Sequence, residues 1–358
     1  MSDQHQRRRG ALAARIAADA DAVLITKPVN VRYLTGLASS NAALLVAAGG
    51  AAVLATDSRY AGTAARICPE LDLIVERATA EALTARAAAD GVRRLAFEAH
   101  VMTVEKHSAL AALDERVAFT PAGHRVEELR LVKDEDEIAL LREACAISDR
   151  ALADVLPSIG PGRTEREIAV ALDRRMIDLG ADAIAFDTIV AAGPNGAIPH
   201  HRPGDRALER GDMVTIDFGA LRGGYHADMT RTFAIGEPAA WQRDVYDLVL
   251  RAQLAAIAAA VPGAETTAVD GAARDLVKAA GHGDDFPHGV GHGVGLEIHE
   301  APLMGYDRTG KLMDRVPVTA EPGVYLAGRG GVRIEDTLVV RPGGPELLTE
   351  TTKDLLVL

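Results

Sequence analysis

Residues 211–232 read GDMVTIDFGALRGGYHADMTRT and predict two short strands joined by a tight turn. Residues 213–218 alternate between an apolar face and a second face that ends in Asp217, which is the period of a strand. The turn is expected at LRGG, residues 221–224, because glycine accepts the positive φ of hairpin turns. Folding about the Arg222–Gly223 bond would place Asp217 opposite Asp228. Facing carboxylates destabilise a sheet, so this pair predicts a cation or a shared proton between them.

A second pair of carboxylates is expected further along the chain. Residues 319–336 read TAEPGVYLAGRGGVRIED, and a hairpin centred on Gly328 would bring Glu321 opposite Glu335. The two hairpins together suggest one site with four acidic ligands. The alternative is that these are solvated edge charges, as most of the 51 acidic residues must be. Against it, both pairs lie in apolar strands beside glycine turns, and a histidine cluster lies between them.

The histidine cluster occupies residues 286–300, FPHGVGHGVGLEIHE. Alternating glycines make a helix costly, so an extended chain is expected, with one face of bare backbone. His288 and His292 would then lie about 13 Å apart at about 3.3 Å per residue, too far for one metal ion. One histidine should therefore ligate, and the others, including His299, should face a substrate. His200 stands on a separate loop, and its position alone decides nothing.

The rest of the chain predicts two domains, with a boundary in the PAGH segment that ends at residue 124. Residues 1–124 alternate expected strands (21–26, 43–46, 51–55, 94–97) with expected helices (11–20, 81–90, 104–114), which is an α/β pattern. Polar turns are expected at 30–36 and 56–60. Residues 125–358 combine the hairpins with expected helices at 134–156, 164–179, 239–260 and 267–280. The whole chain is therefore expected to be of the α+β class, with an antiparallel sheet covered by helices in its second domain.

Composition excludes several classes of function. The net charge of −12 disfavours nucleic acid as a partner, because phosphate binding needs a basic surface. Charged residues interrupt the first 25 positions, so no signal peptide is expected, and no apolar run reaches the 18 residues of a membrane span. Two cysteines without a CxxC motif predict neither a disulfide framework nor a zinc ribbon. A cytoplasmic location is expected.

Five motifs, in this order, resemble the pita-bread metallopeptidases, a family that includes methionine aminopeptidase, aminopeptidase P and prolidase. They are IDFGA, HADMTRTF, HGVGHGVGLEIHE, AEPGVY and GVRIEDT. The likeness is greatest to the Xaa-Pro peptidases. NVRYLTG and TDSRY are similar to the creatinase-like N-terminal domain of that group, so the resemblance spans nearly the whole chain.

The resemblance implies a centre with two divalent metal ions. Asp217 would bind one ion, Asp228 and Glu335 would bridge both, and His292 and Glu321 would each complete one ion's shell. His200, His288 and His299 match positions where the family keeps histidines near the substrate, and Arg333 matches an arginine behind the ligands. The resemblance also suggests a homodimer, and the partner expected is a small peptide with proline at its second position.

The ligand set agrees with hydrolysis. Four carboxylates balance two divalent ions, and oxygen-rich ligation with one imidazole suits manganese, with cobalt, iron or zinc as alternatives. We hypothesise that a bridging hydroxide attacks the carbonyl before proline and that Glu321 handles the proton. His288 and His299 would stabilise the oxyanion and the leaving nitrogen. Some dipeptidases of the group carry an arginine where this chain has Leu303, which leaves dipeptidase and aminopeptidase P activity both open. Arg329 or Arg308 could take the place of that arginine.

Two other classes of function stay open at this point. One is a metal-dependent lyase or hydrolase of the same fold that acts on a small non-peptide molecule. The other is a non-catalytic peptide-binding module, although such domains lose ligands and this chain keeps all five.

Overall fold

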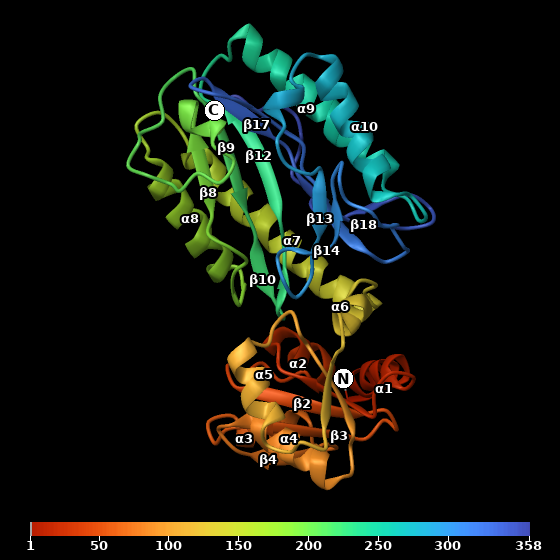
Figure 1. Ribbon diagram of the computed structural model, residues 1–358. Coiled ribbons are helices and arrows are strands. Elements are labelled where there is room, and N and C mark those ends of the chain that lie inside the picture. Colours follow the sequence, from red (N-terminus) through yellow and green to blue (C-terminus); the bar gives the residue numbers. More distant parts are fainter. Residues whose placement is uncertain (1) are drawn as a thin grey trace. The chain divides into compact units, whose positions relative to one another are not determined.

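The computed structural model describes residues 2–358, which form two compact units (Figure 1). The N-terminal unit ends at Arg130, and the C-terminal unit runs from Leu131 to Leu358. Across the described residues, none of the helices combines the length and the apolar composition that crossing a membrane requires.

The N-terminal unit is built on one six-stranded mixed sheet in the order β4-β3-β2-β1-β5-β6. Its strands are β1 (Ala22–Ile25), β2 (Ala42–Ala47), β3 (Ala52–Thr56), β4 (Asp72–Val75), β5 (Arg94–Phe97) and β6 (Ala118–Pro121). Strands β1, β5 and β6 run parallel to one another, whereas β2 is antiparallel to both of its neighbours. Every residue of β1 is buried, which explains its uninterrupted apolar sequence.

Six helices accompany this sheet, and one of them corrects the sequence-based expectation. They are α1 (Ser2–Ile16), α2 (Pro28–Thr35), α3 (Ala61–Ile67), α4 (Thr79–Ala89), α5 (Val104–Ala111) and α6 (Arg125–Arg130). The polar turn expected at 30–36 is wrong, because α2 occupies this segment. Pro28 stands in its first turn, where its missing N–H costs nothing, and Gly36 ends it at φ 80°. Helix α1 also begins well before residue 11, its expected start.

Helix α6 belongs to the N-terminal unit. The Tyr33 hydroxyl donates to the Leu129 carbonyl, and Arg130 donates to the Asn30 side chain. These contacts put the division between the units after Arg130, whereas the sequence suggested a boundary at residue 124.

The C-terminal unit places curved antiparallel sheets between two pairs of helices (Figure 1). Helices α7 (Glu135–Val155) and α8 (Glu165–Asp178) cover β8 (Ile189–Ala192), β9 (Met213–Phe218), β10 (Ala220–Arg222) and β12 (Met229–Ala234) on one side. Helices α9 (Ala240–Ala259) and α10 (Thr266–Ala279) cover the second set of strands. That set comprises β13 (Gly291–Gly293), β14 (Glu300–Met304), β15 (Pro317–Ala320), β16 (Gly323–Leu326), β17 (Gly330–Arg333), β18 (Asp336–Val339) and β19 (Glu346–Leu347). The short strands β7 (Ala183–Ile184) and β11 (Tyr225–His226) flank β10.

Two of the long helices of this unit, α7 and α8, begin at capping boxes. Asp134 and Glu137 exchange side-chain and backbone hydrogen bonds at the start of α7, and Thr164 and Glu167 do the same for α8. The start expected at residue 164 is therefore the helix cap. The α+β class predicted from the sequence is confirmed, and the four long helices lie within two residues of their expected bounds.

The register of the first hairpin differs from the expected one by two residues. Asp217 pairs with Thr230 and not with Asp228, because the two loop residues are Gly223 and Gly224 and not Arg222 and Gly223. Both glycines have positive φ, 60° and 90°, as a tight two-residue turn requires. Asp228 lies just before β12, two residues before the position that faces Asp217.

The second hairpin has the expected register. Gly323 pairs with Arg333 on one side of a break in the ladder, and Ala320 pairs with Asp336 on the other. Continuing either ladder brings Glu321 opposite Glu335. The glycines of the histidine motif let β13 pack closely between β14 and β15, because a Cβ on Gly291 would overlap the Thr319 carbonyl oxygen.

Candidate metal centre

Five side chains from four sheet segments converge inside the C-terminal unit. Asp217 ends β9, Asp228 precedes β12, His292 is in β13, and Glu321 and Glu335 occupy the two sides of the ladder break. Glu335 is 1% exposed, and Asp217, Asp228 and His292 are also buried, whereas Glu321 is partly exposed. The fold thus gathers all five residues that the family resemblance predicted as metal ligands.

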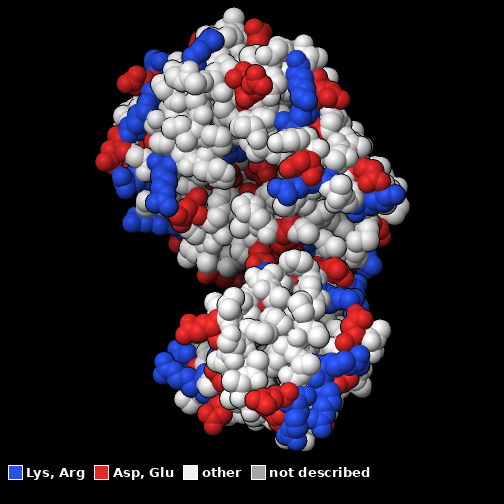
Figure 2. All heavy atoms as spheres, viewed as in Figure 1, with Lys and Arg blue, Asp and Glu red and all other residues white. Residues whose placement is uncertain are grey.

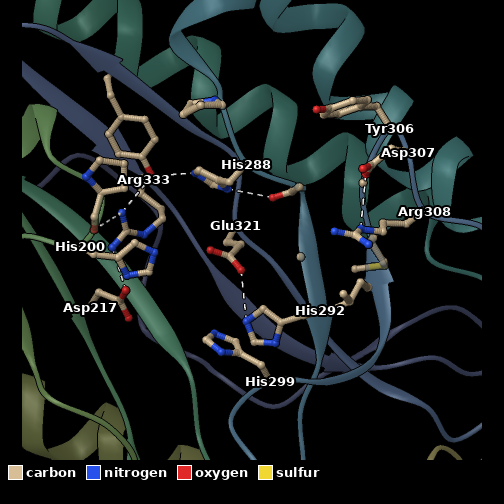
Figure 3. A pocket seen from close by; sticks show the side chains of 18 residues that line it. His200, Asp217, His288, His292, His299, Tyr306, Asp307, Arg308, Glu321 and Arg333 are labelled. Carbon is tan, nitrogen blue, oxygen red and sulfur yellow. Dashed lines mark hydrogen bonds and ion pairs between the residues drawn. The ribbon is translucent and has the colours of Figure 1, made fainter. Parts of the chain in front are cut away.

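The distances within this group are short. His292 Nε2 lies 3.2 Å from Glu321 Oε1 and 3.5 Å from Asp228 Oδ2. Ligand atoms of Asp228, His292 and Glu335 all lie within 4.8 Å of one another. Figure 3 shows Glu321 and His292 pointing toward each other, with Asp217 across the cavity beside Arg333.

Two buried carboxylate oxygens of the group lack a protein partner. Within residues 2–358, neither Asp217 Oδ1 nor Glu335 Oε1 receives a hydrogen bond. A buried carboxylate oxygen without a donor is costly unless a cation or a proton satisfies it. Hard divalent cations take oxygen ligands of this kind, so the donor set fits such ions.

Electrostatics lead to the same conclusion. Burial, followed by the neighbouring charge of Glu335, raises the pKa of Asp228 well above its usual range. Burial, followed by the charge of Glu321, does the same to the pKa of Glu335. Burial also raises the pKa of Asp217, although Arg333 partly offsets it. These neighbouring carboxylates can all be charged at the same time only if positive charge enters the site.

His292 is oriented to present one nitrogen to this group. Its Nδ1 lies 3.0 Å from the Gly293 carbonyl, to which it donates, so Nε2 carries the lone pair of the neutral ring. Burial works against a charged His292, but the hydrogen bond to Glu321 and the charge of Glu321 together outweigh it and raise the pKa of His292. Burial also opposes a charged Glu321, but the hydrogen bond to His292 and the neighbouring positive charges together lower its pKa to about 2. In the metal-free protein, a proton on Nε2 therefore takes the place that a cation can occupy.

Arg333 and Thr230 support the group from behind. Arg333 donates to Asp217 Oδ2 at 2.7 Å, to the Tyr325 hydroxyl at 2.9 Å and to Thr230 Oγ1 at 3.1 Å. The Thr230 hydroxyl in turn donates to Glu335 Oε2 at 2.6 Å. One oxygen of each of Asp217 and Glu335 is thereby fixed, and the other is left for an ion.

A cavity of about 380 Å³ opens onto this group. Its lining includes His200, His288 and His299, all three histidines expected near a substrate, together with Glu321 and Arg333. Figure 2 shows acidic atoms deep in a hollow of the C-terminal unit, surrounded mainly by uncharged residues. A volume of this order suits a small ligand and not a folded protein.

The three histidines differ in their surroundings. His288 has both nitrogens engaged, with the Gly289 carbonyl and with the Tyr325 hydroxyl, each at 2.8 Å. Burial lowers the pKa of His288, so its ring is neutral and accepts from Tyr325. The His299 ring stands 4.4 Å from the His292 ring at 86°, and burial followed by the charge of His292 lowers its pKa.

Sequence reasoning missed three contributors to the site. Tyr325 belongs to the AEPGVY motif, but nothing in the sequence says that its hydroxyl joins His288 to Arg333. The segment 305–308 also lines the cavity and contributes Tyr306, Asp307 and Arg308 (Figure 3). Of these three, the sequence suggested only Arg308, as a substitute for the arginine absent at Leu303. Tyr306 and Asp307 were missed, and their one signal is that they follow the histidine motif closely.

The fold and this site together define a metallopeptidase of the pita-bread type. Residues 139–342 match Metallopeptidase family M24, and residues 7–132 match the Creatinase/Prolidase N-terminal domain. The chain belongs to metallopeptidase family M24.

Known proteins resemble the chain over almost its full length. An Xaa-Pro dipeptidase from Pyrococcus furiosus is 36% identical over 344 residues, which covers 94% of this chain and 95% of that protein. The structure of an Xaa-Pro dipeptidase from Bacillus anthracis superimposes with a TM-score of 0.95 at 34% identity and covers 100% of both chains. An X-Pro aminopeptidase from Thermotoga maritima gives a TM-score of 0.89 at 34% identity, covering 95% of this chain and 96% of that one.

Proposed function

We propose that this chain is a metal-dependent exopeptidase that hydrolyses the peptide bond before proline in short peptides. The observation that carries the proposal is the pair of buried carboxylate oxygens, on Asp217 and Glu335, that have no partner in residues 2–358. Asp217 lines the cavity, and Glu335 lies beside His292. The names of the related dipeptidase and aminopeptidase support proline as the residue after the cleaved bond.

The ligands that we propose for two divalent ions are Asp217, Asp228, His292, Glu321 and Glu335. Manganese is the proposed metal, because four carboxylates and one imidazole form an oxygen-rich set, whereas cobalt, iron and zinc are the alternatives. When bound, such ions polarise a peptide carbonyl and make water a nucleophile near neutral pH.

The chain's own residues would then position the substrate and move one proton. We assign the proton transfer to Glu321, which reaches the cavity and also accepts a hydrogen bond from Thr319. His299 and His200 face the cavity and would donate to the peptide oxygen or the leaving nitrogen. His288 would act by holding the Tyr325 hydroxyl, since both of its nitrogens are engaged. Arg333 would keep Asp217 charged and oriented.

The segment after the histidine motif bears on the choice between dipeptides and longer peptides. Leu303 is 44% exposed and lines the cavity at the position where some dipeptidases carry an arginine. Arg308 lines the same cavity, and its Nε lies 3.4 Å from Asp307 Oδ1. We propose that Arg308 supplies the positive charge for a substrate carboxylate that Leu303 cannot provide.

Three further proposals rest on the sequence and its family resemblance. The protein is cytoplasmic, which cell fractionation tests, and it is a homodimer, which light scattering tests. The division into an accessory domain of residues 1–124 and a catalytic domain of residues 125–358 stays a proposal, although α6 packs on the N-terminal unit; limited proteolysis shows whether the chain is cut before or after α6.

The function is tested by incubating Mn²⁺-loaded protein, and a chelated control, with Ala-Pro, Ala-Pro-Ala and Ala-Ala-Ala. We expect cleavage of one or both proline peptides, no cleavage of Ala-Ala-Ala, and loss of activity after chelation. Cleavage of Ala-Pro-Ala with little of Ala-Pro would make the protein an aminopeptidase P, and the reverse a dipeptidase. If neither proline peptide is cut while metal is bound, the proposal is wrong and the lyase or hydrolase acting on a non-peptide substrate takes its place.

A further inference from the structure

A second cluster of metal-binding side chains lies in the N-terminal unit. Ligand atoms of His100, His124 and Glu127 all lie within 4.8 Å of one another. Two donor atoms that share one zinc ion at about 2.1 Å lie about 3.4 Å apart in a tetrahedral site, so only small side-chain movements would bring these three onto one ion.

The topology of the sheet brings these residues together. Strands β5 and β6 run parallel, and Phe97 pairs with Pro121 at their carboxyl ends. His100 stands three residues after Phe97, and His124 stands three residues after Pro121. The two histidines therefore emerge at the same edge of the sheet, and their ring centroids are 4.2 Å apart. In open α/β sheets, the carboxyl edge of parallel strands is where ligands bind.

Glu127 completes the cluster from the first turn of α6. Its Oε1 lies 3.0 Å from His100 Nε2, 2.9 Å from Asn30 Nδ2 and 3.4 Å from Lys27 Nζ. Its Oε2 is buried and receives no hydrogen bond from any residue in 2–358. One oxygen is thus fully engaged, and the other is held in place without a partner.

A buried network keeps Glu127 in this orientation. The Asn30 amide donates both to Glu127 and to Glu98, at 2.9 and 2.7 Å, and its oxygen accepts from Arg130 at 2.8 Å. Glu98 is itself fixed by the backbone N–H groups of Thr26 and Lys27. Ligands held by such outer contacts lose little freedom when an ion binds.

We propose that His100, His124 and Glu127 form a binding site for a zinc-class divalent ion, separate from the centre in the C-terminal unit. Two imidazoles and one carboxylate suit Zn²⁺, Co²⁺, Ni²⁺ or Cu²⁺, whereas Mg²⁺, Ca²⁺ and Mn²⁺ prefer oxygen-only sets. Three protein ligands leave at least one position for water or an outside ligand. The ion would tie the loop after β5 to the first turn of α6.

Zinc content measured on the full chain tests the proposal without reference to activity. Native protein, His124→Ala and His100→Ala are dialysed against the same Zn²⁺ buffer, and bound zinc is measured by mass spectrometry. We expect each variant to bind one zinc ion fewer per chain than the native protein, whatever number of ions the C-terminal centre holds. The affinity of the His100, His124 and Glu127 site for zinc should fall at least tenfold. His282→Ala is the control, because His282 pairs with Asp285 alone and has no third ligand among the described residues.

Equal zinc in native protein and both variants would overturn the proposal, and so would an equal loss in His282→Ala. Both histidines are exposed, so their variants are expected to fold, which circular dichroism checks. If a variant misfolds, histidine NMR of the native protein decides instead. Zinc must then shift the signals of His100 and His124, and unchanged signals would refute the site.

Discussion

Thr230→Val is expected to weaken metal binding while keeping the fold. The Thr230 side chain is fully buried, and its hydroxyl donates to Glu335 Oε2 and accepts from Arg333 Nε. Valine has the same shape but lacks both hydrogen bonds. Glu335 would then have no hydrogen-bond donor on either of its oxygens.

The magnitude follows from these two lost contacts. Each buried group left without its partner costs about 1–3 kcal/mol, so the free energy of unfolding of the metal-free variant should fall by about 2–6 kcal/mol. Removing a contact that orients a metal ligand typically weakens metal affinity about 10–100-fold, equivalent to about 1.4–2.7 kcal/mol.

Thr215→Val provides a matched control in the adjacent strand. Thr215 is buried, and its hydroxyl bonds only to Thr232 among the described side chains, at 3.0 Å. This variant should lose about 1 kcal/mol of stability and keep native metal affinity. Calorimetric titration with Mn²⁺ and urea unfolding measure the two quantities. If both variants bind Mn²⁺ with the same affinity, Thr230 does not position Glu335 and the reasoning fails.

Three other predictions concern the cavity and its supports. Arg308→Ala should raise KM for Ala-Pro at least tenfold and change KM for an amidated peptide much less, as initial rates would reveal; equal changes would argue against carboxylate binding. Glu165→Gln should destabilise the protein by about 2–3 kcal/mol at pH 7, because Glu165 accepts from Asn195, His201 and two backbone N–H groups. Burial raises the pKa of Glu165, but these hydrogen bonds together outweigh burial and lower the pKa. The difference in free energy of unfolding between the native protein and Glu165→Gln is therefore complete above about pH 5 and shrinks as the pH falls below about 4.5. Urea unfolding between about pH 7 and about pH 3 measures this difference, and a difference that stays constant would contradict the prediction. Gly291→Ala should push β13 away from β15 and lower the melting temperature, whereas Gly343→Ala, at an exposed position with open space around it and no positive φ, is the comparison that separates backbone crowding from loss of glycine.

The sequence predicted the secondary structure best where local signals agree. Asp134 with Glu137 and Thr164 with Glu167 mark helix starts, and the buried apolar residues of the helices that follow recur at helical spacing. Helix α2 was missed because Asn30 and Arg32 interrupt its apolar residues and because its burial depends on tertiary packing. Its two signals, Pro28 and Gly36, stand only eight residues apart.

The five candidate ligands come together in space as the sequence predicted, but only one of their two pairings has the predicted register, and their binding of metal stays a prediction. Alternation and the glycine turn put Asp217 and Asp228 in one hairpin, and a two-residue difference in register left them diagonal and not opposed. Register depends on which turn residues adopt positive φ, and three successive turn residues offered similar choices. Glu321 and Glu335 were placed correctly because their turn is indeed centred on Gly328, which has φ 74°.

Other parts of the site could not be predicted from local sequence. The contacts of Tyr325 with His288 and Arg333 depend on how three segments pack. Likewise, His100 and His124 are 24 positions apart and come together only because β5 and β6 are adjacent and parallel. Such sites follow from topology, which a single sequence specifies only weakly.

Anomalous diffraction from Mn²⁺-loaded crystals shows directly whether the five clustered side chains hold the catalytic metal ions. We expect two anomalous peaks, surrounded by Asp217, Asp228, His292, Glu321 and Glu335, in protein that cleaves a proline peptide. Active crystals with no anomalous peak among these side chains would show that the catalytic metal is not bound there.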